Sequence, residues 1–289
     1  MKITIIGGDL RQLYAAEALA ANGHSVCVSG LENAQHPLPK SICQMPLPSA
    51  ALYAECVLLP FPLEAGDGKL NAPLAAEPIA LEMVFSAIPP QTPVLAGKCS
   101  QQAMALAKGE WLTLFDYGQR EELQVKNAVP SAEGAIGLAM EALPRTLNGA
   151  RALVVGYGRI GKVLARMLEG LGSSVTVSAR KEADLAWIAV NGFEAVHTAE
   201  LENCLGAFDV VFNTVPAMVL PGERLAMLRP DCVVIDLASR PGGTDFAAAA
   251  ELKIRAIHAL GLPGKVAPKS AGIAVAETAL TILREQELL

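Results

Sequence analysis

Residues 154–181 contain the pattern that most constrains the fold of this chain. The apolar pair Val154-Val155 leads into the glycine-rich stretch 156–161, a helical apolar pattern follows, and a second apolar run covers residues 175–179. This order predicts a β-strand, a glycine turn, an α-helix and a second strand. Because strand and helix patterns keep alternating to the end of the chain, the sequence predicts a doubly wound α/β domain with a parallel sheet.

The glycine turn also predicts a dinucleotide site. Gly156, Gly158 and Gly161 allow a tight turn, a close approach of the backbone to a pyrophosphate, and close packing of helix on strand. The N-terminus of the helix then offers N–H groups to the phosphates. The expected cofactor-binding residues here are Gly156, Tyr157, Gly158, Arg159, Ile160 and Gly161.

The end of the second strand indicates which dinucleotide is bound. NAD-binding units place an acidic residue about twenty residues after the glycines, where it holds the ribose 2′-hydroxyl. Here the place is taken by Ala179, Arg180 and Lys181, and the next carboxylate is Glu182. Cations suit a 2′-phosphate, since a planar guanidinium binds it through two hydrogen bonds. We predict NADP rather than NAD, with a solvated helix start as the alternative reading of both cations.

Two later loops follow strands of the same predicted domain. Strand 209–213 runs into Thr214-Val215-Pro216, which we expect beside the ribose of the cofactor. Strand 232–237 opens into a loop whose two glycines let the backbone approach a ligand. In this loop Arg240 is a candidate catalytic cation, with a structural ion pair as the alternative. Asp245 is predicted as a helix-start residue, a substrate-facing base or the partner of Arg240.

A loop rich in proline and glycine, residues 261–272, precedes the final helix, predicted at residues 270–287. Lys269 lies where the helix dipole disfavours a cation, so a bound anion is expected to compensate it. We therefore group Lys269 with Arg240 and Asp245 as candidate catalytic residues. The helix is expected to cross back to the first domain.

The first half predicts a second Rossmann-like domain. Its glycine turn, Gly7-Gly8-Asp9, lacks the full spacing, and Asp9 would repel a phosphate, so this domain need not bind nucleotide. Arg11 follows at a helix start, where it suits either a substrate carboxylate or an ordinary salt bridge. Residues 63–77 are predicted as a long loop, either a lid or a surface excursion.

A helix from about Asn127 to Leu143 is predicted to join the two domains, with Ser131 as its N-cap and Glu133 in its first turn. We expect Asn127, Ser131 and Glu133 at the mouth of a cleft between the domains, as substrate-binding residues. The predicted organisation is a substrate domain at 1–125, the connecting helix at 126–148, an NADP-binding domain at 149–269 and a returning helix at 270–289.

Composition limits the class of function. Hydrophobic residues make up 52% of the 289 residues and charged residues 18%, enough for substantial cores. A net charge of -6 without a basic run argues against a nucleic-acid partner. Charges, prolines and glycines interrupt each apolar stretch, so we expect no membrane span and a cytoplasmic protein. The six scattered cysteines predict reduced thiols and no metal site; Cys99 is not favoured as a nucleophile.

Four stretches together resemble the A subunit of bacterial dipicolinate synthase. They are residues 7–12, residues 129–134, residues 236–246 with the sequence DLASRPGGTDF, and Gly261-Leu262-Pro263-Gly264 with Val266-Ala267-Pro268-Lys269. The resemblance covers essentially the whole chain, and the last two stretches are the most specific. Residues 63–77 match the family least well.

The resemblance implies a function together with a flavoprotein-like B subunit of dipicolinate synthase. The pair would oxidise dihydrodipicolinate, or its hydroxytetrahydro precursor, to dipicolinate in the mother cell of a sporulating bacterium. A dicarboxylate substrate would need cations, for which Arg11, Arg240 and Lys269 are the candidates. Asn127 and Ser131 would orient the ring, and Asp245 and Glu133 are candidate bases.

Two other functions remain open at this point. One is a different small-acid dehydrogenase of the shikimate or alanine dehydrogenase kind. The other is a non-catalytic nucleotide-binding protein that regulates its partner. Assembly into homo-oligomers is also open.

Overall fold

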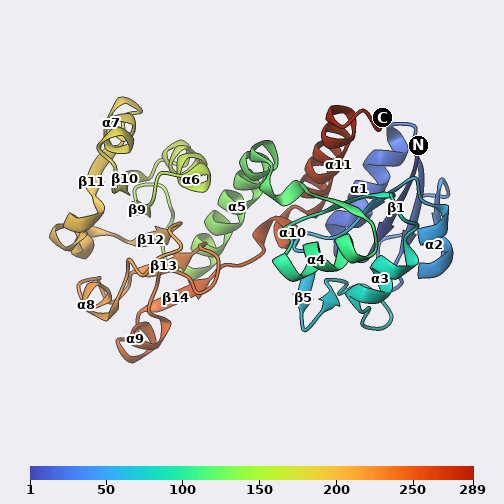
Figure 1. Cartoon of the computed structure of the whole chain (residues 1–289). Helices are drawn as coiled ribbons and strands as arrows, with labels where there is room; N and C mark the ends of the chain where they lie inside the picture. The colour runs from blue at the N-terminus through green and yellow to red at the C-terminus, as the bar shows by residue number, and fades with distance from the viewer. The chain divides into compact units, whose positions relative to one another are not determined.

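The computed structural model describes every residue from Met1 to Leu289 and divides the chain into two compact units. The first unit comprises residues 1–127 and 267–289, and the second comprises residues 128–266. Each unit contains one six-stranded sheet with helices on both faces, as Figure 1 shows. The two parallel sheets confirm the predicted class of two doubly wound α/β domains.

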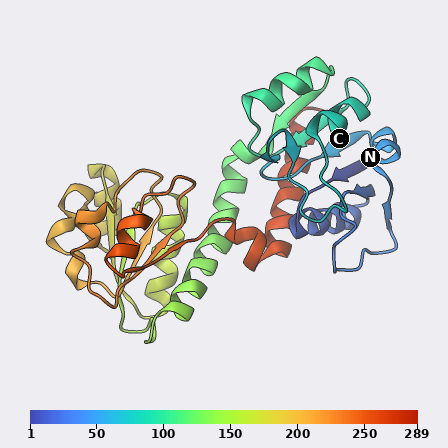
Figure 2. The same ribbon diagram turned by 90° about the horizontal axis from the view of Figure 1, so that it is seen from below.

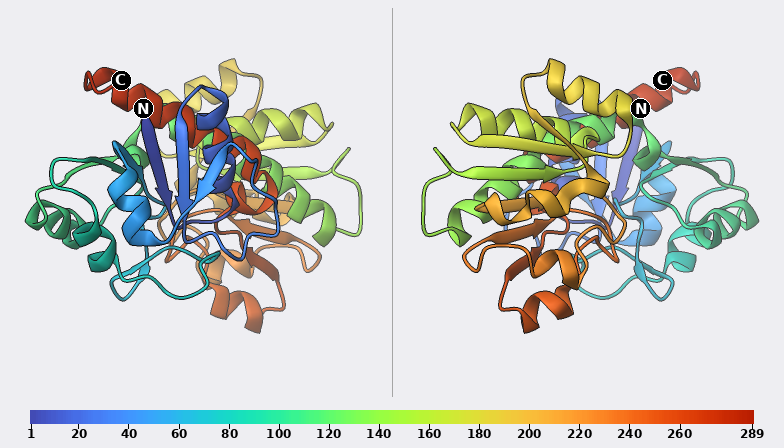
Figure 3. Two further views of the ribbon diagram at one scale, coloured as in Figure 1. Left: turned by 90° about the vertical axis from the view of Figure 1, so that its right-hand side faces the viewer. Right: turned by 90° about the vertical axis from the view of Figure 1, so that its left-hand side faces the viewer.

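The sheet of the first unit has the order β3-β2-β1-β4-β7-β8, and all its neighbouring strands are parallel. Its strands are β1 (Lys2–Ile6), β2 (Ser25–Ser29), β3 (Ile42–Gln44), β4 (Cys56–Leu58), β7 (Pro93–Ala96) and β8 (Thr113–Asp116). The left panel of Figure 3 shows β1 and β2 (blue) side by side. Successive side chains of β1 point to opposite faces, so that Ile5 joins one hydrophobic cluster and Ile6 another.

Helices cover both faces of this sheet. Those on the Ile5 side are α1 (Leu10–Ala21) and α11 (Pro268–Glu285), and those on the Ile6 side are α2 (Leu47–Tyr53), α3 (Leu81–Ala87) and α4 (Gln101–Gly109). A 3₁₀-helix, η1 (Tyr117–Gln119), follows β8. The C-terminal helix α11 therefore completes the core of the N-terminal unit.

Helix α11 packs on α1 so closely that only glycine fits at the contact. A Cβ atom at Gly272 would lie 2.4 Å from the carbonyl oxygen of Arg11 and 2.8 Å from Cβ of Tyr14. The two chain termini lie near each other beside this helix pair (Figures 1 and 2). Because α11 starts at Pro268, earlier than the predicted residue 270, Lys269 lies in its first turn.

The sheet of the second unit repeats the topology in the order β11-β10-β9-β12-β13-β14, again all parallel. Its strands are β9 (Arg151–Val155), β10 (Ser174–Ala179), β11 (Glu194–His197), β12 (Val210–Asn213), β13 (Val233–Asp236) and β14 (Arg255–His258). Helices α6 (Arg159–Gly170) and α7 (Glu182–Val190) lie on one side, and α8 (Gly222–Leu225) and α9 (Phe246–Glu251) on the other (Figure 1). The 3₁₀-helices η2 (Thr198–Asn203) and η3 (Leu205–Ala207) join the α8 side.

Helix α5 (Glu121–Ala142) is a single helix of 22 residues that packs on the α6 side of the second sheet (Figure 2). The prediction that Ser131 caps its N-terminus is wrong, because the helix begins ten residues earlier in sequence, at Glu121. Glu121 and Glu122 in the first turn favour that start through the helix dipole. Pro130 lies inside the helix, where its missing N–H removes one backbone hydrogen bond.

The predicted long loop at residues 63–77 contains a hairpin of β5 (Glu64–Gly66) and β6 (Lys69–Leu70). Leu63 and Leu70 are buried in the core of the first unit. The predicted loop at residues 261–272 also contains a short helix, α10 (Leu262–Val266). No helix of the structure combines the length and the apolar character that crossing a bilayer requires. All six cysteines are free thiols.

We predict that Gly272→Ala destabilises the first unit by about 1–3 kcal/mol, because the added methyl collides with backbone atoms that cannot rotate away. Gly137→Ala is the matched control, since a Cβ at Gly137 meets no atom within 4 Å and alanine favours a helix interior. Urea-induced unfolding followed by circular dichroism measures both changes. Equal midpoints for the two variants would contradict the close contact between α1 and α11.

Candidate functional site

The glycine turn after β9 has the conformation that a dinucleotide needs. Gly156 has φ +101°, and a Cβ at Gly161 would lie 2.1 Å from the carbonyl oxygen of Gly156, so both positions require glycine. Gly158, the N-cap of α6, has no atom within 4 Å of the place where a Cβ would stand. The N-terminus of α6 thus faces open space, where a phosphate can approach the backbone N–H groups.

The corresponding turn of the first unit is filled by the chain itself. A Cβ at Gly7 would lie 2.5 Å from the Leu70 side chain, and the N–H of Gly8 donates to the carbonyl of Asn71 at 2.9 Å. Glu32, just beyond β2, accepts the N–H groups of Gly30 and Ala76. This turn therefore cannot receive a pyrophosphate in the way that the turn of the second unit can.

A cavity of about 300 Å³ opens at the glycine turn of the second unit. The residues lining it come from the ends of several strands: Gly156, Tyr157, Gly158, Ala179, Arg180, Lys181, Asp184, Thr198, Thr214, Val215, Pro216, Ala217 and Val219. All of the predicted cofactor-binding residues line it except Arg159, Ile160 and Gly161. Those three form the first turn of α6, where Gly161 is buried against β9.

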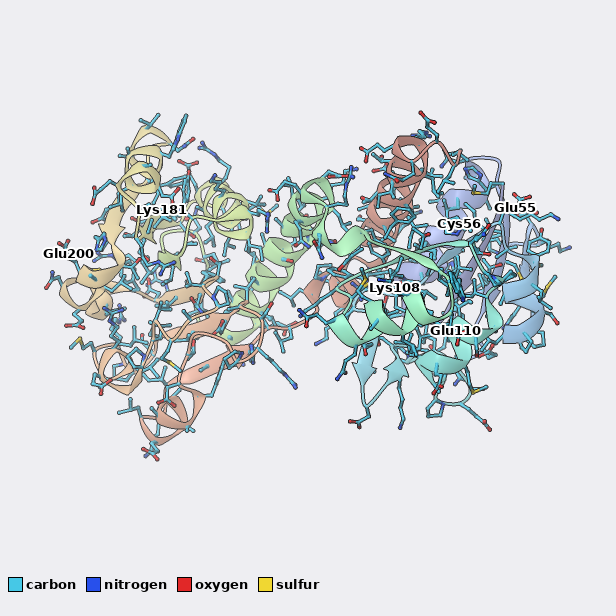
Figure 4. All side chains as sticks on the ribbon, viewed as in Figure 1. Glu55, Cys56, Lys108, Glu110, Lys181 and Glu200 are labelled. Atoms are coloured by element: carbon cyan, nitrogen blue, oxygen red, sulfur yellow. The ribbon has the colours of Figure 1, made fainter.

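Cations dominate the end of this cavity near α7. Arg180 and Lys181 are both exposed, and Figure 4 shows Lys181 at the base of α7. The carbonyl of Arg180 is bonded to Nε2 of His197 at 3.2 Å, which holds the backbone of this loop in place. Asp184, half-buried, is the one carboxylate among the lining residues. Two cations and one carboxylate therefore line this end of the cavity.

A buried carboxylate joins the two loops that follow β12 and β13. Asp236 is fully buried, and its Oδ1 accepts hydrogen bonds from Nδ2 of Asn213 and the N–H of Ala238, each at 2.9 Å. Its Oδ2 accepts the N–H of Gly243 at 2.8 Å. Oδ1 of Asn213 in turn accepts the N–H of Val215 at 3.0 Å. These hydrogen bonds fix both loops at the edge of the sheet where the cavity lies.

Arg240 is presented on the loop that Asp236 holds. It is exposed, precedes a cis peptide bond to Pro241, and makes no ion pair with any residue of the chain. Asp245 is the N-cap of α9, and its Oδ1 accepts the N–H of Ala248 at 3.0 Å. Of the three roles predicted for Asp245, the structure shows the helix-start role, and the predicted pair with Arg240 does not form.

Of the two roles predicted for Arg11, the structure shows the salt bridge. Its guanidinium binds the carboxylate of Asp9 at 2.8 and 2.9 Å and the carbonyl of Phe61 at 2.5 Å, with 12% of the side chain exposed.

Burial raises the pKa of the Cys99 thiol to about 12, which removes this thiol as a nucleophile at neutral pH.

The predicted substrate and catalytic residues divide between the two units. Arg11, Asn127 and Lys269 belong to the first unit, whereas Ser131, Glu133, Arg240 and Asp245 belong to the second. Asn127 and Ser131 are buried residues of α5, and Lys269 is exposed.

Sequence reasoning missed His258, which ends β14. Its ring stacks on Phe246 at 5.1 Å, and its Nε2 bonds the carbonyl of Ala238 at 3.0 Å. Because a carbonyl only accepts, Nε2 carries the proton, and in the neutral ring Nδ1 is the acceptor. The available signal was a histidine at the carboxyl end of a predicted strand, at the same sheet edge as the glycine turn.

His258 lines a second cavity of the second unit, about 550 Å³ in volume, together with Glu133, Glu141 and Lys265. The loop carrying Arg240 contacts residues of both cavities: Ala238 bonds His258, and Gly243 packs against Val215 and Ala217. The second unit therefore brings a dinucleotide-shaped site, an unpaired arginine and a histidine to one edge of one sheet.

Models of known protein families match both units of the chain. Residues 2–118 match the family of N-terminal domains of the dipicolinate synthase A subunit, and residues 124–260 match the family "D-isomer specific 2-hydroxyacid dehydrogenase, NAD binding domain". The second match agrees with the open glycine turn and supports an oxidoreductase that binds a nicotinamide dinucleotide.

Relatives match over nearly their whole length. The dipicolinate synthase A subunit of Bacillus subtilis (strain 168) is 33% identical over 99% of this chain and 96% of its own. The crystal structure of the dipicolinate synthase A subunit from Bacillus halodurans superposes with a TM-score of 0.89 at 33% identity, covering 98% of this chain and 97% of that chain. The crystal structure of the Bacillus subtilis protein gives 0.87 at 31% identity, covering 99% and 97%. With sequence and fold in agreement over both units, this chain belongs to the family of dipicolinate synthase A subunits.

Proposed function

We propose that the chain is an NADP-dependent oxidoreductase that aromatises dihydrodipicolinate, or its hydroxytetrahydro precursor, to dipicolinate. The observation that carries this proposal is the open glycine turn of the second unit, beside two exposed cations, in a member of this family. Aromatisation of a dihydropyridine removes one hydride and one proton, and a bound nicotinamide takes up the hydride. The hydroxytetrahydro form loses one water in addition.

The choice of NADP rests on charge. A 2′-phosphate adds a dianion at the adenosine end, and the lining there offers Arg180 and Lys181 against the single carboxylate of Asp184. The guanidinium geometry allows two hydrogen bonds to one phosphate. The expected NAD pattern would instead place a carboxylate directly at the end of β10, where this chain has Ala179 and Arg180.

The substrate role rests on Arg240. A dicarboxylate needs a cation that no internal carboxylate already neutralises, and Arg240 meets this condition whereas Arg11 is paired with Asp9. The Asp236 network holds the loop, so that little freedom is lost when a carboxylate binds. Glu133 and Nδ1 of His258 supply proton acceptors in the second cavity.

We propose further that the chain acts with the flavoprotein-like B subunit of dipicolinate synthase in the mother cell of a sporulating bacterium. Family membership supports this partnership. An ultraviolet assay for pyridine dicarboxylate, run with and without the B subunit, tests it. Hydride transfer by the purified chain alone would reject the alternative of a non-catalytic regulatory protein, and turnover of another small acid at a higher rate would favour the alternative dehydrogenase.

We predict that Arg180→Gln weakens NADPH binding about 10–100-fold and leaves NADH binding nearly unchanged, since a hydrogen bond to a charged group contributes roughly 1.5–3 kcal/mol. Calorimetric titration of both nucleotides measures the effect. Lys108→Gln is the control: it removes an exposed cation of α4 in the other unit (Figure 4). Equal affinity of the native chain for NADH and NADPH would defeat the 2′-phosphate argument.

We predict that Arg240→Ala raises the KM for the dihydro substrate and lowers kcat/KM by about 10²–10³-fold, because an ionic hydrogen-bond partner of a carboxylate is lost. Arg240→Lys restores part of the loss, since it keeps the charge but not the fork. NADPH affinity should stay unchanged in both variants. An Arg240→Ala enzyme with native KM and turnover would exclude Arg240 from the substrate site.

A further inference from the structure

A third cavity of the second unit lies between α6 and α7, outside the dinucleotide cavity. Its volume is about 350 Å³, within the range of small-molecule pockets. The side chains lining it are three aromatic rings, two cations and one amide: Tyr157, Phe193, Trp187, Lys162, Arg166 and Asn191. Nothing in the proposed reaction uses this group, apart from Tyr157, which lines the dinucleotide cavity as well.

One of the three aromatic rings of this cavity is exposed. Trp187 has 61% of its surface in water, whereas Phe193 and Tyr157 are buried at 7% and 9% exposed. An indole ring is a large apolar surface, and a flat partner stacked on it recovers much of the free energy that exposure costs. Trp187 therefore offers an exposed stacking surface in a cavity that two buried rings also line.

The cations of the cavity are only partly neutralised. Nζ of Lys162 lies 5.4 Å from the centre of the Tyr157 ring and forms no ion pair. Arg166 lies 5.3 Å from the centre of the Phe193 ring and pairs with Glu169 at 2.5 Å, on a side chain that is 59% exposed. Exposed pairs of this kind contribute little and exchange readily for another carboxylate. Two cations face one carboxylate, so the cavity attracts an anion.

From this arrangement we propose that the cavity is a second ligand site, specific for a planar aromatic carboxylate. The ring stacks on Trp187, and a carboxylate binds Arg166 and Lys162. Since Tyr157 lines both cavities, occupancy of this site changes the affinity for the dinucleotide, and the dinucleotide changes the affinity of this site by the same factor. If the proposed function holds, the aromatic dicarboxylate product is itself such a ligand, and the site then senses product.

The test uses Trp187 as its own reporter. The chain has two tryptophans, Trp111 and Trp187, and Trp111 is 79% exposed, so Trp111→Phe leaves a folded protein with one tryptophan inside the site. We expect saturable quenching of its fluorescence by pyridine-2,6-dicarboxylate. Cyclohexane-1,3-dicarboxylate, which has the charges without the ring, and pyridine, which has the ring without the charges, should each bind at least tenfold more weakly.

Variants of the charged residues should change the affinity for the dicarboxylate in opposite directions. On the Trp111→Phe background, Arg166→Gln and Lys162→Gln should each weaken binding at least fivefold. Glu169→Gln removes the competing carboxylate and should strengthen it, and Lys108→Gln in the other unit should change nothing. NADPH titrations with and without the dicarboxylate should differ in the native charge background, and the difference should be smaller in Arg166→Gln.

The outcomes separate this proposal from the proposed function. Quenching that never saturates, or that saturates equally in Arg166→Gln and Lys162→Gln, overturns the second site. Quenching that is lost only in Arg240→Ala assigns the ligand to the catalytic loop, which also overturns the second site and leaves the proposed reaction intact. Saturable, charge-dependent binding by a chain that oxidises no dihydrodipicolinate supports the second site and removes the proposed reaction.

Discussion

The contact between Gly161 of α6 and the carbonyl of Gly156 is the constraint on which the function of the second unit depends. A Cβ atom at Gly161 would lie only 2.1 Å from that carbonyl oxygen, so the helix packs directly on the turn that follows the strand. Gly158, the N-cap of α6, then lines the cavity at the sheet edge. Each other candidate group, from Arg180 to Arg240, is positioned relative to that edge by a parallel strand.

The two units have the same topology, but only the second unit has an open glycine turn. Both have the same six-strand order, with a glycine turn after the first strand. In the first unit Leu70 and Asn71 of the β5–β6 hairpin region fill and bond that turn, whereas the turn of the second unit has open space at Gly158. The difference lies in a few residues of a connecting segment, because a doubly wound sheet always offers its carboxyl edge to whatever can reach it.

The fold and the dinucleotide cavity were predictable from the sequence, because strand periodicity, glycine spacing and helix patterns are local signals. The start of α5 was not: Pro130-Ser131 looks locally like a helix start, but burial of residues such as Ala132 and Ala135 holds the helix together through it. The filling of Gly7 by Leu70 and the role of His258 depend on contacts between distant segments. No periodicity within one segment carries that information.

The Asp236 network explains why the loop that carries Arg240 can be both polar and stiff. A buried carboxylate is costly unless its oxygens are bonded, and here three donors bond them, one at the end of β12 and two in the loop after β13. The same bonds fix Gly243 against Val215 and Ala217 of the dinucleotide cavity, and place Ala238 against His258. Any movement of the Arg240 loop must therefore break bonds to the cofactor side or to the histidine side. The dinucleotide cavity, the Arg240 loop and His258 are therefore linked through one fully buried side chain.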